Sequence, residues 1–191
     1  PPSQEAVARL GTLTLDLPVN QHRLTAIGYF AASDGALALT PVGTQANQGL
    51  LRRLAHAVFG GGGGSPRWYL LPGGEGPSTS ALDVGAPPGT DVYSPVTGTV
   101  IGITPVVIDG KVYGQRIDIQ PLAAPSLVVS VSDLAADRAL IVGSQITQGS
   151  TKLGGLLDLS KVEQQTLSHY TNDAGNHVLV EVHAAALVDV R

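Results

Sequence analysis

Short segments rich in Val, Ile, Leu and Thr, interrupted by glycine and proline, are the feature of this sequence that most constrains its fold. The 191 residues include 24 glycines and 13 prolines, residues that break helices and favour turns. We expect strands at about 68–71, 91–93, 97–103, 111–120, 127–132 and 177–188. This spacing predicts a mostly β protein, built as an antiparallel β-sandwich or a partly closed barrel.

The N-terminal part predicts a β-rich extension. Threonine and leucine alternate in Thr12–Leu15, and alanine and leucine alternate in Ala36–Leu39, with the turn signal Ser33-Asp34-Gly35 between them, as expected of two strands. Because this part carries none of the pattern found later in the chain, we divide the chain into an extension, 1–66, and a β domain, 67–191.

Two helices are expected, one on each side of this boundary. Apolar residues at helical spacing predict a helix over about 47–59, followed by a surface loop at Gly60–Gly64. Ser160 and Glu163 have the spacing of a capping box, which predicts a helical insertion at about 160–173 that ends at Gly175.

The composition excludes several classes of function. A formal charge of −4, with no basic cluster larger than Arg52-Arg53, argues against nucleic-acid binding. The chain has no cysteine, so disulfides and thiolate metal ligands are excluded, and no methionine, which indicates that its own start, for example a signal peptide or anchor, has been removed. No apolar segment approaches the roughly 18 to 20 residues of a membrane span.

Three segments resemble, in the right order, the lysostaphin-type murein endopeptidases, a family of zinc metallopeptidases. The first, Leu82–Val100, contains Leu-Asp-Val-Gly and then Pro-Pro-Gly-Thr-Asp-Val and Val-Thr-Gly-Thr-Val. The second, Ile141–Gly149, is similar to the family's Gly-x-x-Val-x-x-Gly hairpin, and the third, Asn176–Val182, to its final His-x-His strand. The resemblance covers about 68–187 and implies the duplicated hybrid motif type of β fold. It also implies a bacterial, secreted or cell-envelope location.

The resemblance implies a metal site that has lost most of its ligands. In the family, zinc is held by a histidine, an aspartate four residues later and the second histidine of His-x-His, and a water molecule takes the open position. Those positions correspond here to Thr79, Asp83 and Leu179. Asp83 and the neighbouring His177 are therefore the residual metal ligands that we expect, and together they are not sufficient for tight zinc binding.

The catalytic residues that the resemblance implies are also altered. His177 corresponds to the first histidine of His-x-His, and its usual histidine partner corresponds to Asp133. We assign His177 and Asp133 as vestigial catalytic residues. His183 lies on the same strand face as His177 but roughly 20 Å away, so it cannot share one ion with it. Ordinary structural roles remain open for these residues: Asp83 could accept backbone hydrogen bonds in a turn, and His177 could be a polar residue at a strand start.

The sequence leaves several functions open. The first hypothesis is a non-catalytic domain that binds peptidoglycan or an envelope protein, with no cofactor. The second is an active zinc endopeptidase that cleaves peptidoglycan cross-links with a rearranged metal site. The Gly-Thr and Gly-x-Val segments also occur in biotinyl and lipoyl carriers and in a sugar-phosphotransfer carrier, which would use Lys152 or His177, but neither residue has the expected flanking sequence or partner.

Overall fold

The computed structural model describes residues 1–32, 35–48 and 66–186, and strands make up 46% of the structure against 5% helix, so the predicted mostly β fold is confirmed. These described residues contain two short 3-10 helices, η1 (Gln21–Arg23) and η2 (Thr166–Tyr170). The strands are β1 (Ala6–Leu10), β2 (Leu13–Asp16), β3 (Ala26–Phe30), β4 (Thr40–Pro41), β5 (Thr44–Gln45), β6 (Arg67–Leu70), β7 (Ala81–Gly85), β8 (Asp91–Tyr93), β9 (Gly98–Ile108), β10 (Lys111–Pro121), β11 (Leu127–Ala136), β12 (Gln145–Ile146), β13 (Lys152–Leu156) and β14 (His177–Ala184).

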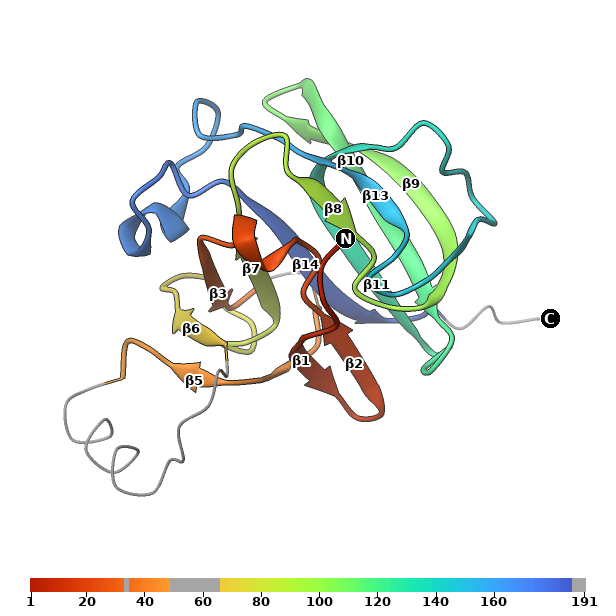
Figure 1. The fold of residues 1–191 in the computed structure, drawn as a ribbon, viewed down its shortest axis with the longest axis horizontal. Helices are drawn as coiled ribbons and strands as arrows, with labels where there is room; N and C mark the ends of the chain where they lie inside the picture. Colours follow the sequence, from red (N-terminus) through yellow and green to blue (C-terminus); the bar gives the residue numbers. More distant parts are fainter. Residues whose placement is uncertain (33–34, 49–65, 187–191) are drawn as a thin grey trace.

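The strands form two sheets that pack as a sandwich (Figure 1). The large sheet has the order β12-β9-β10-β11-β14-β7-β3-β6-β5, with β13 paired to β11 and β8 paired to β13. The small sheet has the order β2-β1-β4. Leu13 and Leu15 of the small sheet share one buried cluster with Val84 and Val180 of the large sheet, so the main core lies between the two sheets. In the described part of the chain, neither sheet closes into a barrel.

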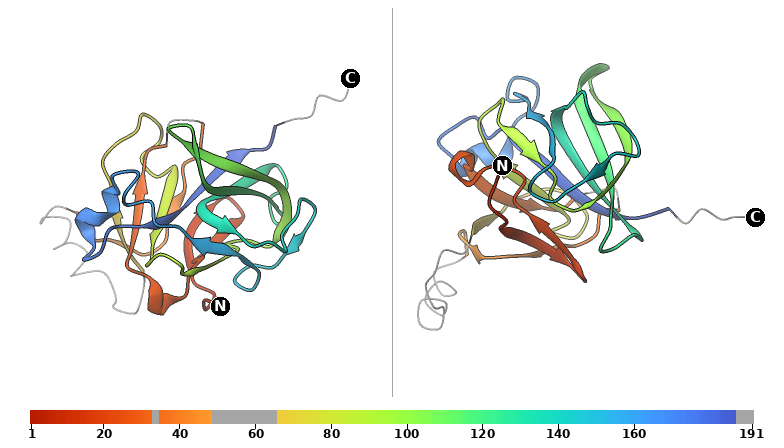
Figure 2. Two further views of the ribbon diagram at one scale, coloured as in Figure 1. Left: turned by 90° about the horizontal axis from the view of Figure 1, so that it is seen from above. Right: turned by 45° about the vertical axis from the view of Figure 1, so that its right-hand side comes forward.

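Alternation along the central strands separates the core from a second face. Val178, Val180 and Val182 of β14 are fully buried in the core, as the sequence pattern predicted. Because successive side chains point to opposite faces, His177 and Leu179 lie on the face that points away from the core. In both views of Figure 2, η2 (blue) lies to the left of strands β9 and β10 (green).

The N-terminal residues contribute strands to both sheets. Strand β3 pairs antiparallel with β7 and parallel with β6, so it extends the large sheet beyond β7. Tyr29 of β3 is fully buried, packs edge-on against Trp68 of β6 and donates a hydrogen bond to the carbonyl of Val7. The division of the chain at residue 66 stays a prediction.

Most of the predicted strands are confirmed, and one is wrong. Ala36–Leu39 does not form a strand, although the backbone N–H of Leu37 bonds to Val182 and that of Leu39 bonds to Thr79. Three predicted features fall on residues that the structure does not describe. The loop at Gly60–Gly64 and the turn at Ser33-Asp34 lie there completely, and the helix at 47–59 lies there almost completely.

The predicted insertion near Ser160 consists of turns and η2 instead of a regular helix. The Ser160 hydroxyl donates to the Asp158 carboxylate, and its N–H is shared between Asp158 and the Asn176 side chain. The Glu163 N–H bonds to the carbonyl of Leu159. Because Ser160 and Glu163 have these other partners, the reciprocal bonds of a capping box do not form.

Two adjacent glycines of β13 give a matched test of this packing. A Cβ on Gly154 would collide with the backbone carbonyl of Ala135 on β11, whereas a Cβ on Gly155 meets nothing within 4 Å. We expect Gly154→Ala to lower the free energy of unfolding by about 1–3 kcal/mol and Gly155→Ala to change it by less than about 0.5 kcal/mol. Urea denaturation of both variants measures the difference, and equal effects would contradict the β11–β13 packing.

Candidate functional site

Three of the residues chosen from the sequence come together on the face of the large sheet that points away from the core. They are Asp83 on β7, Asp133 on β11 and His177 on β14, which come from three adjacent strands. The Nε2 atom of His177 lies 3.3 Å from Asp83 Oδ1 and 3.8 Å from Asp133 Oδ2. One imidazole therefore stands between two carboxylates.

Asp83 is placed by the register of three strands. It pairs with Gly28 of β3 on one side and with Leu179 of β14 on the other, and its side chain is only 4% exposed. The contact of Oδ1 with His177 lacks hydrogen-bond geometry, so this buried oxygen has no hydrogen-bond partner. An unsatisfied buried carboxylate oxygen is rare and calls for an explanation.

Asp133 reaches the site through a β-bulge. Gln115 of β10 pairs with Leu134 and Ile117 pairs with Val131, so Ser132 and Asp133 together oppose one residue of β10. Asp133 has a φ of +67°, a left-handed conformation that aspartate adopts more readily than most residues. Bulges redirect side chains in this way, and here the bulge brings the carboxylate close to His177.

His177 is oriented by its own strand start. Its Nδ1 atom lies 3.0 Å from the carbonyl oxygen of Gly175, to which it donates a hydrogen bond, and this leaves Nε2 facing the carboxylates. The preceding Asn176 is buried and accepts hydrogen bonds from the backbone of Leu159 and Ser160. These bonds hold the start of the insertion at Ser160 next to His177.

Burial and charge shift the protonation of all three groups. Burial raises the pKa of Asp83 to about 6, and the charge of His177 opposes this rise. Burial also raises the pKa of Asp133, again against His177. Burial alone would lower the pKa of His177, but Asp83, the bond to Gly175 and Asp133 together raise it above its ordinary value. The site therefore favours a charged imidazole between the two carboxylates.

The positions that correspond to the other two zinc ligands carry no suitable donor. The Thr79 hydroxyl donates to the carbonyl of Leu39 at 2.7 Å, and Leu179 packs against a small cluster of buried alanines. Neither side chain offers the imidazole nitrogen that the family's zinc uses, so the residues at these positions do not fit that metal. Within 1–32, 35–48 and 66–186, no group of three or more His, Cys, Asp or Glu side chains is arranged to hold a metal ion.

A cavity of about 160 Å³ lies over Asp83 and His177. Its other walls come from the ends of strands and from the insertion, and the residues that form them are Phe30, Leu71, Pro72, Glu163, Gln164, Gln165 and Thr166. None of these seven was predicted as a site residue from the sequence. Glu163 was predicted to belong to a capping box, and Phe30 and Leu71 had only the pattern of strand residues.

The remaining histidines and Lys152 lie away from this cavity. His22 is in η1 and His169 is in η2, and His183 lies 3.6 Å from Glu181 on the outer part of β14. His56 lies outside the described residues. Lys152 forms an ion pair with Asp91 at the start of β13.

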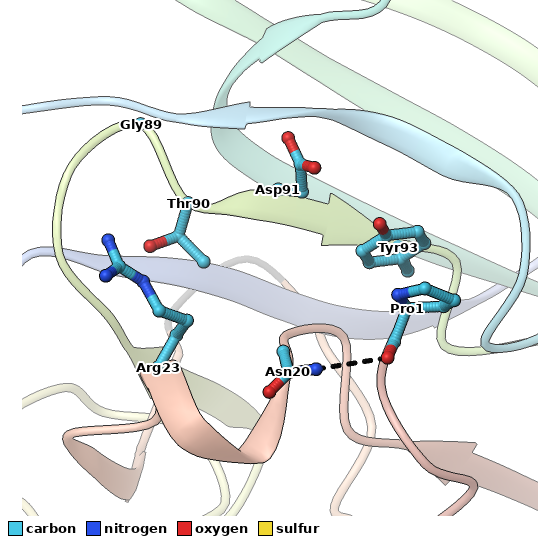
Figure 3. A pocket seen from close by; sticks show the side chains of 7 residues that line it. All are labelled: Pro1, Asn20, Arg23, Gly89, Thr90, Asp91 and Tyr93. Atoms are coloured by element: carbon cyan, nitrogen blue, oxygen red, sulfur yellow. Dashed lines mark hydrogen bonds between the residues drawn. The ribbon is translucent and has the colours of Figure 1, made fainter.

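A larger pocket of about 320 Å³ contains none of the residues predicted for the site (Figure 3). It lies between η1 and β8: Arg23 and Thr90 are at one end, and the rings of Pro1 and Tyr93 are at the other. The Asn20 side chain donates to the carbonyl of Pro1 at 3.1 Å. Asp91, which also lines this pocket, is paired with Lys152.

Comparisons with known proteins give only a weak structural likeness. No family model matches the chain, and no curated protein matches it. A crystal structure of Helicobacter pylori Csd3 matches with a TM-score of 0.45 and 16% identity, over 93% of this chain and 32% of that one. The chain thus spans about a third of the length of that protein. In the described residues, no helix is long and apolar enough to cross a membrane.

Replacing Asp83 with asparagine tests the electrostatics of the site. The charge of Asp83 raises the pKa of His177 against the effect of burial, so Asp83→Asn should lower the pKa of His177. Asp133→Asn should lower it less, because Asp133 contributes less to the rise. An NMR titration of the His177 ring protons measures both, and an unchanged pKa in Asp83→Asn would refute the close pairing.

The raised pKa of Asp83 also predicts how stability depends on pH. Between the ordinary pKa of 3.8 and about 6, the folded state holds the Asp83 proton that the unfolded state has released, so rising pH destabilises the folded state. Over this range, wild type should lose up to about 3 kcal/mol of unfolding free energy relative to Asp83→Asn. Urea denaturation at several pH values measures this difference, and a difference that does not change with pH would contradict the assignment.

Proposed function

We propose that this chain is a metallopeptidase-like domain of the bacterial cell envelope that does not cleave its ligand, and that it binds peptidoglycan or an envelope protein through the face that carries Asp83 and His177. The proposal places the protein outside the cytoplasm, secreted or in the envelope, and requires no cofactor. It combines the three resembling segments of sequence with the chemistry of the site.

The single observation that carries the non-catalytic part is Leu179. In the register of the sheet, Leu179 stands directly opposite Asp83, at the position of the family's last zinc ligand. Its side chain packs against Ala32, Ala36 and Ala81. A hydrocarbon side chain at this place has no atom that can bind zinc. What remains on this face is a small cavity lined by both polar and apolar side chains, which supports binding better than peptide-bond cleavage.

Co-sedimentation with isolated peptidoglycan sacculi tests the binding part. Wild type should be depleted from the supernatant, and His177→Ala should be depleted less, because it loses a side chain that lines the cavity. Asp109→Asn, in the exposed β9–β10 turn, is the matched control and should behave as wild type. If wild type stays in solution, peptidoglycan is not the ligand. If soluble muropeptides are released, the domain cleaves.

A rearranged zinc endopeptidase is the second candidate, and one observation favours it. The Nδ1–H of His177 bonds to a backbone carbonyl, which is the way that many metal-binding histidines are oriented. Elemental analysis after dialysis against zinc and removal of loosely bound ion tests it. About one zinc per chain, lost on Asp83→Ala or His177→Ala, would put the peptidase first.

Rebuilding the family's set of zinc ligands tests whether Thr79 and Leu179 occupy the positions of those ligands. The double variant Thr79→His with Leu179→His should retain about one zinc per chain, whereas wild type should retain far less under the same dialysis. Thr79→Ala with Leu179→Ala is the control, because it makes the same two truncations without adding a ligand. If the histidine variant folds, as judged by its circular dichroism, and retains no more zinc than the control, then Thr79 and Leu179 do not correspond to the zinc ligands.

A further inference from the structure

Strand β9 leaves most of one edge of the large sheet open. Its first residues pair with β12, and Val100 exchanges backbone hydrogen bonds with Gly143 and Ser144. From Ile101 to Ile108, β9 pairs with β10 on one side, and no described segment pairs with it on the other. We call the unpaired side of Ile101–Ile108 the free edge. At about 3.3 Å per residue it is roughly 26 Å long, which is enough to accept another strand.

The free edge carries no charge. Long open edges are usually protected by lysine or another charged residue, which prevents pairing with a second chain, but no residue of β9 is charged. On the adjacent strand β10, Arg116 and Asp118 neutralise each other in an ion pair of 3.1 Å. The turn at the tip carries one charge of each sign, Asp109 and Lys111. Pro105 protects the edge only in part, because it lacks an N–H but still offers a carbonyl group.

Exposed apolar side chains gather at both ends of the free edge. At one end lies Ile101, and the turn that carries Ile141 and Val142 is hydrogen-bonded to β9 next to it. At the other end lie Val107 and Val112, which are cross-strand partners. These residues are 43% to 67% exposed, and they are five of the six large apolar residues that are exposed in the described part of the chain. Such a concentration marks a surface that lacks its partner.

We propose that the free edge docks a second copy of this chain, paired antiparallel across a two-fold axis near Thr104. In that arrangement the Ile101 end of each copy lies beside the Val107 end of the other, so both apolar clusters are covered at once. A two-fold interface uses the same patch on both copies and must be self-complementary. An uncharged strand with an apolar cluster at each end meets this condition, although the whole chain carries a net charge of −4.

The same features argue against a charged or polar peptide as the occupant. Such a segment would find no opposite charge along β9, and it would leave the apolar clusters at both ends uncovered. A second copy supplies both clusters by symmetry. The dimer is expected to be weak, because one pair of strands buries little surface and Pro105 donates no bond. Since β10 and β11 separate β9 from β14, this inference is independent of the proposed function.

Sedimentation equilibrium of the chain from about 5 to 500 μM tests the proposal. The weight-average mass should rise from that of a monomer towards that of a dimer, and added salt should not prevent the rise, because no ion pair is formed. Hydrogen exchange at both ends of this concentration range locates the contact: amides within 101–108 should exchange more slowly at high concentration. A mass that stays monomeric throughout, or protection that appears elsewhere, would overturn the proposal.

Charged variants at the two ends test the antiparallel arrangement. Ile101→Lys and Val107→Glu change exposed side chains, so both should fold, as judged by circular dichroism. Each alone should weaken association by about tenfold or more, because it places an unpaired charge against an apolar cluster. An equimolar mixture of the two should recover association, since the new lysine of one chain then lies beside the new glutamate of the other. No recovery in the mixture would rule out this arrangement.

Leu122→Lys is the matched control. Leu122 is the sixth exposed apolar residue and lies outside the free edge, so this variant makes the same kind of exchange as Ile101→Lys at another place. It should associate as wild type does. If Leu122→Lys weakens association as much as Ile101→Lys, then general stickiness of apolar side chains explains the association and the proposed interface is wrong.

Discussion

The pairing of β14 with β7 on one side and β11 on the other is the constraint on which the site depends. Val178, Val180 and Val182 of β14 are fully buried between the sheets. Because side chains alternate along a strand, a shift of one residue would exchange this apolar row with His177, Leu179 and Glu181. The burial of three valines, worth roughly 1.5–3 kcal/mol each, therefore fixes the register that sets Asp83 opposite Leu179 and beside His177.

The same register buries charged side chains at the site, and burying them lowers the stability of the folded state. Asp83 is almost fully buried, and burial raises its pKa to about 6. The β-bulge at Asp133 adds a second carboxylate in a left-handed backbone conformation. Core packing alone requires neither feature, and an apolar residue at either position would avoid the cost of burying charge. Such groups often mark functional sites, which supports the placing of ligand binding on this face.

The sequence was informative where side-chain pattern alone decides the outcome. Alternation located β14 and its core face, and the resemblance selected Asp83, Asp133 and His177, which lie on three adjacent strands. Prediction from the sequence failed where local polar groups form hydrogen bonds with residues that the local pattern does not include. Ser160 bonds to Asp158 and Asn176 instead of starting a helix, and Leu37 and Leu39 bond to distant backbone carbonyls without forming a strand. The cavity wall at Phe30 and Glu163 depends on contacts between segments far apart in the chain, which no local pattern records.

The face that carries Asp83 combines two largely buried carboxylates with one imidazole. The imidazolium of His177 compensates only in part, since Asp133 and Glu163 also act on it.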